Sequence, residues 1–422
     1  MTTTAAETPT GTGAPRARAR GAGASGPAVF ALIALFCGSG HAEGPAKGAA
    51  PGLGDLVVRA DMETSVYADS DHVSVVTPTL GASVESPLAG WSAGGRYLID
   101  VVTAASVDIV ATATRPFREA RHVISADGAY KRGDLAGAVS ASASIEPDYV
   151  SAGGGGSLSR ELHHKQVTLQ IGYGYSRDTA GRAGTPFEVF RRPLDRHSMS
   201  ASVSWIADRS TIAAVVGDMV VEDGDPSKPY RYVPMFEPGA GSLVPAGAAI
   251  GFVDSFRAHE RPLEQLPLSR GRFALTGRVA HRSSGATVRI AERLYTDTWG
   301  LVASTTDLRL ILDVTPRLAA ATHARAHVQS GAFFWRRAYE LEIGKGGRWT
   351  PPALRAGDRE LGPMYTITSG FAADIDLSRT PGARAWALRL TAEGMFTHFL
   401  DALYISRRVG VFAAVDLAAT FD

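Results

Sequence analysis

The most regular pattern in the chain is an alternation of apolar and polar residues, and it is clearest at positions 167–176. The odd positions carry Val, Leu, Ile, Tyr and Tyr, and the even positions carry Thr, Gln, Gly, Gly and Ser. Because successive side chains of a β-strand point to opposite faces, the segment predicts a strand with one apolar and one polar face. Residues 198–205 repeat the design with four serines opposite Met, Ala, Val and Trp. A single strand of this kind also fits a soluble sandwich, so the number of repeats decides between the two folds.

The pattern returns about sixteen times after residue 55. Two segments depart from it. The glycine run Gly153–Gly156 carries little pattern and leaves a bend open. Glu292 falls on the apolar face of its segment. The predicted strands are Leu56–Tyr67, His72–Glu85, Ser92–Thr103, Glu119–Tyr130, Asp134–Ile145, Val150–Arg160, Lys165–Ser176, His197–Ile206, Thr211–Val221, Arg270–His281, Ala286–Asp297, Leu301–Val314, Arg317–Gln329, Met364–Leu377, Arg384–Phe399 and Val409–Asp422.

The length and number of these segments predict a membrane barrel. About ten residues of tilted strand cross a bilayer, and no later run approaches 18 consecutive apolar residues. Within lipid every backbone polar group must find a partner, so strands that cross a membrane must close on themselves. We therefore predict an all-β fold, a transmembrane antiparallel up-and-down β-barrel of about sixteen strands, with fourteen or eighteen as alternatives.

The lengths of the connections agree with this prediction. Short turns follow the even-numbered segments, and the long connections, at 104–118, 177–196, 222–269 and 330–363, follow odd-numbered ones. Bacterial outer-membrane barrels have short periplasmic turns and longer extracellular loops. The first strand is then expected to start in the periplasm, and 222–269 to form a long extracellular loop. The last segment has an apolar face that includes Phe421, although Asp422 follows this aromatic residue, and it is expected to pair with the first.

The N-terminal region, residues 1–42, reads as a signal peptide. Three arginines precede the apolar run Ala28–Cys37, and Gly40–Ala42 offers a small-x-small cleavage site. The run is too short to span a bilayer as a helix. A lipoprotein alternative would make Cys37 the lipid-bearing residue, but the bulky Phe36 before it is unfavourable. Residues 43–54 are expected to form a short periplasmic tail and 55–422 the barrel, in the outer membrane of a Gram-negative bacterium.

Charge and composition limit the partners. Lys and Arg total 43 and Asp and Glu 42, so the basic excess of a nucleic-acid-binding protein is missing. The expected partners are outer-membrane lipids and the outer-membrane assembly machinery, and the oligomeric state stays open. No cofactor or metal is expected. His323 and His327 lie about 13 Å apart on one strand, too far to share a metal ion.

Three stretches resemble a family of uncharacterised bacterial outer-membrane barrel proteins, a domain-of-unknown-function family. They are Tyr97–Asp108 (Y-L-I-D-V-V-T-A-A-S-V-D), Ser227–Pro234 (S-K-P-Y-R-Y-V-P) and Tyr295–Leu301 (Y-T-D-T-W-G-L). The resemblance extends from about residue 55 to the end of the chain. It implies the barrel fold and the outer-membrane location, and it brings no substrate or catalytic residue.

Charged residues on the polar faces are the first candidate site. These residues could form a charged constriction, or eyelet, that selects solutes. Alternatively, they could form an ion-pair network that fills the barrel, since each buried charge needs a partner. These lumen candidates are Arg272, Arg278, Arg289, Arg293, Arg309, Arg325, Arg389 and Glu393.

Polar residues in the predicted loops are the second candidate. They could bind a ligand or a cation, but Asp and Ser also stabilise turns. These loop candidates are Asp100, Thr103, Ser106, Asp108, Lys228 and Arg231.

The function that these features favour is a passive, weakly selective pore for small polar solutes. A barrel of about sixteen strands leaves room for an aqueous channel, and the nearly cancelling charges predict no strong preference for anions or cations. One alternative is a plugged structural or assembly barrel that binds envelope partners. Another is an outer-membrane lipid-modifying enzyme, but no His and Ser stand out on adjacent lipid-facing positions. The expectation is therefore that the protein is not an enzyme.

Overall fold

The computed structural model describes residues 56–104, 117–182, 184–344, 347–378 and 385–421. The predicted signal peptide, the periplasmic tail and the loop candidates Ser106 and Asp108 lie outside these ranges. The elements are β1 (Val57–Asp69), β2 (Val73–Ser86), β3 (Trp91–Ala104), β4 (Phe117–Arg132), β5 (Leu135–Glu146), β6 (Tyr149–Leu162), β7 (Val167–Ala180), β8 (Arg192–Ile206), β9 (Thr211–Gly224), β10 (Met235–Phe236), η2 (Gly241–Leu243), α2 (Ile250–Phe256), β11 (Ser269–Ser283), β12 (Ala286–Asp297), β13 (Val302–Thr315), β14 (Leu318–Gln329), β15 (Tyr339–Glu340), β16 (Glu342–Ile343), β17 (Trp349–Thr350), η3 (Arg359–Leu361), β18 (Met364–Asp376), β19 (Trp386–Phe399) and β20 (Arg407–Phe421).

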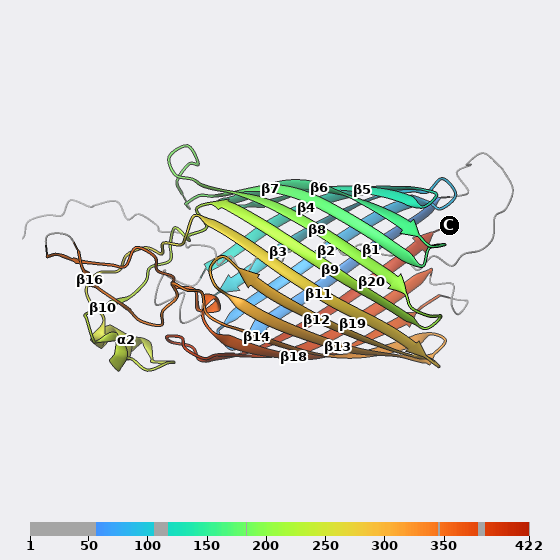
Figure 1. Ribbon diagram of the computed structural model, residues 1–422. Helices are drawn as coiled ribbons and strands as arrows, with labels where there is room; N and C mark the ends of the chain where they lie inside the picture. The colour runs from blue at the N-terminus through green and yellow to red at the C-terminus, as the bar shows by residue number, and fades with distance from the viewer. Residues whose placement is uncertain (1–55, 105–116, 183, 345–346, 379–384, 422) are drawn as a thin grey trace, which may run out of the picture.

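Sixteen long strands form one closed antiparallel barrel (Figure 1), which confirms the predicted fold class. Each strand pairs with the next, in the order β1 to β9, β11 to β14 and β18 to β20. The barrel closes where β1 pairs with β20, from Val58 opposite Phe421 to Asp69 opposite Gly410. The first and last strands are therefore neighbours, as the sequence predicted, and every one of the sixteen has two hydrogen-bonded neighbours.

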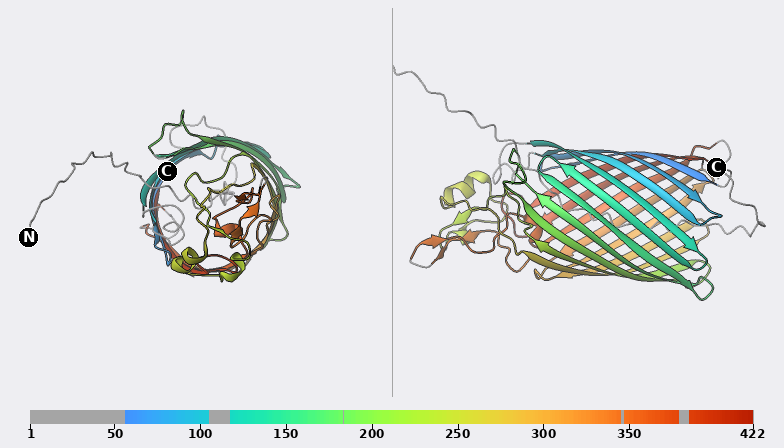
Figure 2. Two further views of the ribbon diagram at one scale, coloured as in Figure 1. Left: turned by 90° about the vertical axis from the view of Figure 1, so that its left-hand side faces the viewer. Right: turned by 90° about the horizontal axis from the view of Figure 1, so that it is seen from above.

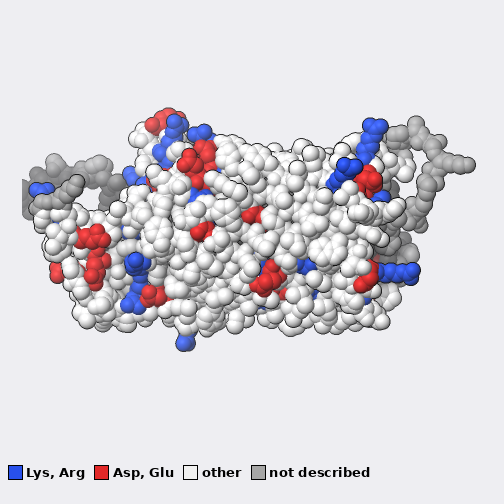
Figure 3. All heavy atoms as spheres, in the orientation of Figure 1, with Lys and Arg blue, Asp and Glu red and all other residues white. Residues whose placement is uncertain are grey.

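The period-2 pattern determines which side chains face outward. The large apolar side chains of the strands are exposed on the outer wall, including Leu169, Ile171 and Tyr173 on β7 and Phe273 and Leu275 on β11. The alternate positions of the same strands then face the lumen. On the outer face shown in Figure 3, most charged atoms lie toward the two ends of the barrel and few lie in between. An apolar belt with polar ends is the surface that a bilayer requires.

The glycine run in β6 is regular strand and not a bend. Residues 153–156 pair without interruption with β5 on one side and β7 on the other. A Cβ atom on Gly153 would lie 2.6 Å from the Cβ of Ser176, and one on Gly155 would lie 2.7 Å from the carbonyl oxygen of Tyr173. The run therefore lacks a pattern because the wall is too tightly packed at these positions to hold side chains.

Glu292 faces outward, as its place in the alternation predicted, near the middle of β12. It accepts hydrogen bonds from two hydroxyls of β13, Ser304 Oγ and Thr306 Oγ1, each at 2.5 Å. Both hydroxyls lie on the same outer face, since Glu292 is directly opposite Thr306 in the register. The carboxylate therefore keeps polar partners on an otherwise apolar surface.

The two ends of the barrel differ. At one end, which we call the turn end, β4–β5, β8–β9, β11–β12 and β13–β14 are joined by two to four residues, and the described chain begins and ends there. At the other, the loop end, segments 225–268 and 330–363 project beyond the strands (Figures 1 and 2). We call these two segments together the cap. The two longest connections lie at the loop end, as predicted, although β1–β2 and β5–β6 are joined there by only three and two residues.

The cap has small apolar cores of its own. Met235 and Phe236 of β10 are completely buried, and the parallel pairing of β10 with β15 joins the two cap segments. One cluster surrounds Phe236 and includes Val244 and Val253. Another includes Trp299, Phe334 and Trp335. Because of these clusters, the cap is a packed structure and not a pair of extended loops.

No described helix is long and apolar enough to cross a membrane.

Candidate functional site

The lumen wall formed by β5 to β8 is lined in its central part by small polar residues. The outward positions of these strands carry Val139, Leu158, Ile171 and Met199, so the alternate positions face inward. The residues on the inner face are Ser140, Ser142, Ser144, Ser151, Gly153, Gly155, Ser157, Ser159, Gln170, Gly172, Gly174, Ser176, Ser198, Ser200, Ser202 and Ser204. The central part of this quarter of the wall is therefore lined by short, polar, uncharged side chains, and the charged inward residues Glu161, Asp178 and Arg196 lie toward its ends.

The wall formed by β11 to β14 and β18 to β20 carries the lumen candidates predicted from the sequence, and further charged residues, such as Asp61 and Arg96, face inward on β1 and β3. All eight lumen candidates predicted from the sequence occupy inward positions, because they alternate with exposed apolar residues. Most of them have a partner. Five pairs can be named: Arg272 with Glu222 at 2.8 Å, Arg293 with Asp218 at 2.9 Å, Arg325 with Asp307 at 3.1 Å, Arg389 with Asp374 at 2.6 Å, and His323 with Glu393 at 3.6 Å.

The contact between His323 and Glu393 depends on a glycine. His323 lies on β14 and Glu393 on β19, and Gly370 of β18 lies between them in the register. A Cβ atom on Gly370 would lie 2.7 Å from Glu393 Cγ and 3.1 Å from His323 Nδ1. The missing side chain therefore lets two residues from non-adjacent strands meet over the sheet.

Arg278, Arg289 and Arg309 differ from the other lumen arginines. They lie on consecutive strands, β11, β12 and β13, their side chains are exposed, and none has an ion pair within the described ranges. Arg289 is directly opposite Arg309. Directly opposed like charges destabilise a sheet, so this arrangement has a cost that folding alone does not explain. We call these three residues the arginine trio.

Hydrogen bonds and ion pairs join the two segments of the cap. Glu264, whose side chain is fully buried, accepts from the backbone nitrogens of Lys228 and Gly357 at 3.1 Å each. Arg231 lies 3.4 Å from Glu264 and 3.0 Å from Asp358. One carboxylate in segment 225–268 therefore holds the other segment in place.

The cap also contacts turns at the loop end of the barrel that lie away from the strands to which the cap is joined. Tyr230 donates a hydrogen bond to Asp148 in the β5–β6 turn, at 3.0 Å, and Arg359 pairs with Asp71 in the β1–β2 turn, at 2.5 Å. β5 lies four strands before β9, and β1 lies four strands beyond β14. Each cap segment thus reaches about a quarter of the way around the barrel. Seen from the loop end, cap segments cross the outline of the barrel (Figure 2).

The cap perturbs the protonation of its charged groups. Burial lowers the pKa of Lys228, and the nearby Arg231 lowers it further. Burial raises the pKa of Glu360, as does the neighbouring Asp358. Burial alone would also raise the pKa of Asp358, but the Arg231 guanidinium and the backbone N–H of Glu360 hold it below its usual value. The charge state of the cap is thus set by its own packing.

The predicted loop candidates separate in the structure. Lys228 and Arg231 lie in the cap, as expected. Asp100 and Thr103 belong to β3 and not to the loop after it, which corrects that part of the prediction. Asp100 is nearly buried and accepts hydrogen bonds from Thr77 Oγ1 at 2.6 Å and from Arg121 Nε at 2.8 Å. The strand continues past Asp100 because Val101–Ala104 still pair with β4.

One group of possible metal ligands occurs among the described residues. Carboxylate oxygens of Glu119, Glu146 and Asp148 lie within 4.8 Å of one another at the loop end. Tyr230 already donates to Asp148, and Lys228 acts electrostatically on Glu146. The group therefore belongs to the contact between the cap and the loop end of the barrel, which the sequence did not indicate because Glu119 on β4 is far along the chain from Glu146 and Asp148.

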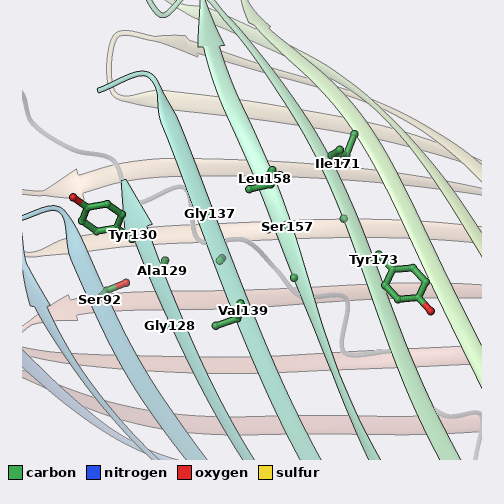
Figure 4. Close-up of a pocket in the computed structure, with 13 residues that line it drawn as sticks. Ser92, Gly128, Ala129, Tyr130, Gly137, Val139, Ser157, Leu158, Ile171 and Tyr173 are labelled. Atoms are coloured by element: carbon green, nitrogen blue, oxygen red, sulfur yellow. The ribbon is translucent and has the colours of Figure 1, made fainter. Parts of the chain in front are cut away.

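A depression on the outer wall lies over β4 to β7 (Figure 4). Its floor includes Gly128 and Gly137, and Tyr130, Leu158 and Tyr173 stand around it. These aromatic and aliphatic side chains are exposed on the outward face. The depression is therefore part of the apolar exterior and not of the lumen.

The chain contains one Gly-x-Ser-x-Gly run, Gly90–Gly94. In hydrolases this run places the serine on a sharp turn between a strand and a helix. Here Gly90 ends the β2–β3 turn and Ser92 lies within β3, directly opposite Ala129 of β4. The run therefore lacks the structural context of a nucleophile.

Comparison with known proteins gives only distant similarities. No family model matches the chain, so the family resemblance stays a prediction, and no curated protein matches it. Among solved structures, the outer-membrane protein OpdK of Pseudomonas aeruginosa has a TM-score of 0.40 at 8% identity, with 87% of this chain and 100% of OpdK covered. The ferric enterobactin receptor PfeA has a TM-score of 0.40 at 9% identity, with 81% and 54% covered.

The siderophore receptor PirA of Acinetobacter baumannii has a TM-score of 0.42 at 10% identity, with 82% of this chain and 53% of PirA covered. The chain spans about half the length of the two siderophore receptors. Because these TM-scores are below 0.5, the fold assignment depends on the closed strand order itself.

Proposed function

We propose that the protein is an outer-membrane barrel of a Gram-negative bacterium that conducts small polar solutes passively. The support for a membrane location is a closed barrel whose exposed strand positions are apolar and whose inward positions are polar. The turn end would face the periplasm and the cap the outside, in keeping with the usual asymmetry of such barrels.

The observation that carries the proposal is the composition of the inner wall. Eight-stranded barrels are filled by their side chains, whereas sixteen strands enclose a wide lumen. Serine and glycine line the inner face of β5 to β8, which leaves this lumen open to water along one wall. A tightly packed interior would instead need large apolar side chains on these positions.

The cap would constrict the pore at its outer mouth. Its segments reach the rim at Asp148 and Asp71, and their buried contacts hold them there. Solutes would then pass between the cap and the barrel wall. Size selection would occur at the cap, and charge selection would occur deeper, along the arginine-bearing wall.

Single-channel recording on the purified full chain in planar bilayers tests the proposal. We expect discrete ohmic conductance steps, and we expect the Glu264→Ala variant, which loosens the cap, to conduct more than the wild type. The matched control is Glu260→Ala, an exposed glutamate in the same cap segment. If neither the wild type nor Glu264→Ala conducts, the pore proposal fails. Cell fractionation tests the location, and recovery in the inner membrane would refute it.

One observation favours a second candidate, a structural barrel whose mouth is closed by the cap. The two cap segments are joined by parallel pairing of β10 with β15 and by the buried Glu264. Such a barrel would bind envelope partners through the cap. We propose no enzymatic activity, and a lipid-release assay on the same preparation tests this directly, since released fatty acid would identify an enzyme.

A further inference from the structure

The lumen arginines divide into two sets according to their neighbours across the sheet. Arg325 is directly opposite Asp307, and Arg389 is directly opposite both Asp374 and Asp416. The arginine trio has no such neighbour. Arg278 faces Ala214 and Ala291, Arg289 faces Ala280 and Arg309, and Arg309 also faces His323. Cross-strand register therefore supplies no carboxylate to any member of the trio.

The trio forms one compact patch. Directly opposed residues in an antiparallel sheet have Cα atoms about 5 Å apart, which applies to Arg289 and Arg309. Arg278 is a diagonal neighbour of Arg289, because its direct partner is Ala291, two residues further along β12. All three lie in the half of their strands nearer the turn end. Long, flexible arginine side chains at this spacing can converge on one small ligand.

The nearest carboxylates are held elsewhere. Asp307 pairs with Arg325, Asp313 with Arg282, and Glu393 contacts His323. Three positive charges therefore share one stretch of wall with no negative side chain paired to them. Guanidinium groups present planar donors that match oxyanions, often with two hydrogen bonds to one group.

We propose that Arg278, Arg289 and Arg309 form a binding site for the oxyanion group of a solute in the turn-end half of the lumen. This inference rests on the proposed pore function and changes one expectation about it. The total charge of the chain nearly cancels and many lumen charges cancel in local pairs, but the trio leaves β11 to β13 with a local excess of positive charge. The pore then prefers anions, and its solutes carry a carboxylate or a phosphate.

The competing possibility is a cation path along β20 and β1. Glu63 and Asp416 are directly opposite each other there. Arg389 is the other direct neighbour of Asp416, and it also pairs with Asp374. This acidic patch thus contains its own arginine, whereas the trio contains no acid. The trio is therefore the more uniform cluster of like charge.

Binding is tested first without relying on conduction. Isothermal titration of inorganic phosphate, and separately of succinate, into the detergent-solubilised full chain is carried out at constant ionic strength. A hydrogen bond to a charged group typically contributes enough for about a tenfold change in affinity. We therefore expect about tenfold weaker binding in each of Arg278→Gln, Arg289→Gln and Arg309→Gln. Binding of phosphate alone, of succinate alone or of both supports the site and identifies its ligand class.

The matched control is Arg389→Gln, which removes the same charge from the lumen wall, and the carboxylate that it releases, Asp374, lies on β18, two strands beyond β13. It should bind the anion as the wild type does. Circular dichroism establishes that each variant keeps the barrel. If neither anion binds the wild type, or if Arg389→Gln weakens binding as much as the trio variants, the site is refuted.

Reversal potentials in a salt gradient then connect the site to the pore. We expect anion preference in the wild type and its reduction in the trio variants. A protein that binds phosphate but never conducts retains the site and refutes the pore. A pore that conducts with cation preference and binds no oxyanion refutes the site and retains the pore. The two proposals therefore fail in different ways.

Discussion

Glu264 is the residue on which the cap depends most clearly. Its fully buried carboxylate accepts from two backbone nitrogens in different cap segments and contacts Arg231. Glu264→Ala would leave both backbone donors without this acceptor and Arg231 with Asp358 as its remaining partner. An unsatisfied buried donor costs about 1–3 kcal/mol. Two donors, partly rescued by water, give a loss of about 3 kcal/mol in the free energy that keeps the cap closed.

A change of about 3 kcal/mol raises the equilibrium between open and closed cap by roughly two orders of magnitude. Limited proteolysis with trypsin measures this equilibrium when opening is fast relative to cleavage. Arg231 and Arg257 are trypsin sites in the segment that would open, so cleavage of Glu264→Ala should accelerate by a similar factor. Glu264→Gln retains one acceptor oxygen and should show a smaller increase.

The exposed Glu260 supplies the control for this experiment. Glu260→Ala lies in the same segment and should be cleaved at the wild-type rate. The thermal unfolding of the barrel should be unchanged in both variants, because neither residue belongs to a strand. Cleavage of Glu264→Ala at the wild-type rate would refute the reasoning, since the cap would then be held by contacts other than the buried carboxylate.

Two further predictions concern the wall and the cap. Gly370→Ala should destabilise the barrel by about 1–3 kcal/mol in urea unfolding, because its Cβ would lie 2.7 Å from Glu393 Cγ. Gly394→Ala, where no atom lies within 4 Å, should be close to neutral, and equal losses would contradict the packing argument. The lowered pKa of Lys228 means that an opened cap binds more protons than a closed one, so closure should strengthen as pH rises from neutral toward 10. Proteolysis normalised to an unstructured substrate should slow over this range in the wild type but not in Lys228→Met, and parallel profiles would exclude Lys228 as the cause.

The strands and their faces could be predicted from the sequence because an alternation of period 2 needs only local information. The alternation in residues 167–176 indicates which side chains face outward, and it does so without any knowledge of the neighbouring strands. The division of the lumen arginines could not be predicted in this way. Arg309 and Arg325 share the same kind of position, and only the register places an aspartate opposite Arg325 and an arginine opposite Arg309.

The cap was predictable in length but not in structure. A long loop was expected at 222–269, yet nothing periodic in it shows that Glu264 would accept a hydrogen bond from Gly357 in the other segment. Such contacts join residues far apart in the chain, and short irregular elements such as β10 and α2 carry little pattern. Asp100 was misplaced for a related reason, since a polar residue near the end of a strand resembles the start of a loop until its partner, Arg121, is known.

The pairing between β1 and β20 determines when the barrel can close during assembly. Among the described strands it is the one pairing that joins the two ends of the barrel sequence, since each of the others links consecutive barrel strands. Closure must therefore wait until the last strand, which ends at residue 421, is available to pair. Until then Val57–Asp69 and whichever strand has been added last present unpaired backbone edges, and such edges recruit other strands. A temporary strand partner at both edges would protect the nascent barrel, and the last strand to arrive would displace it.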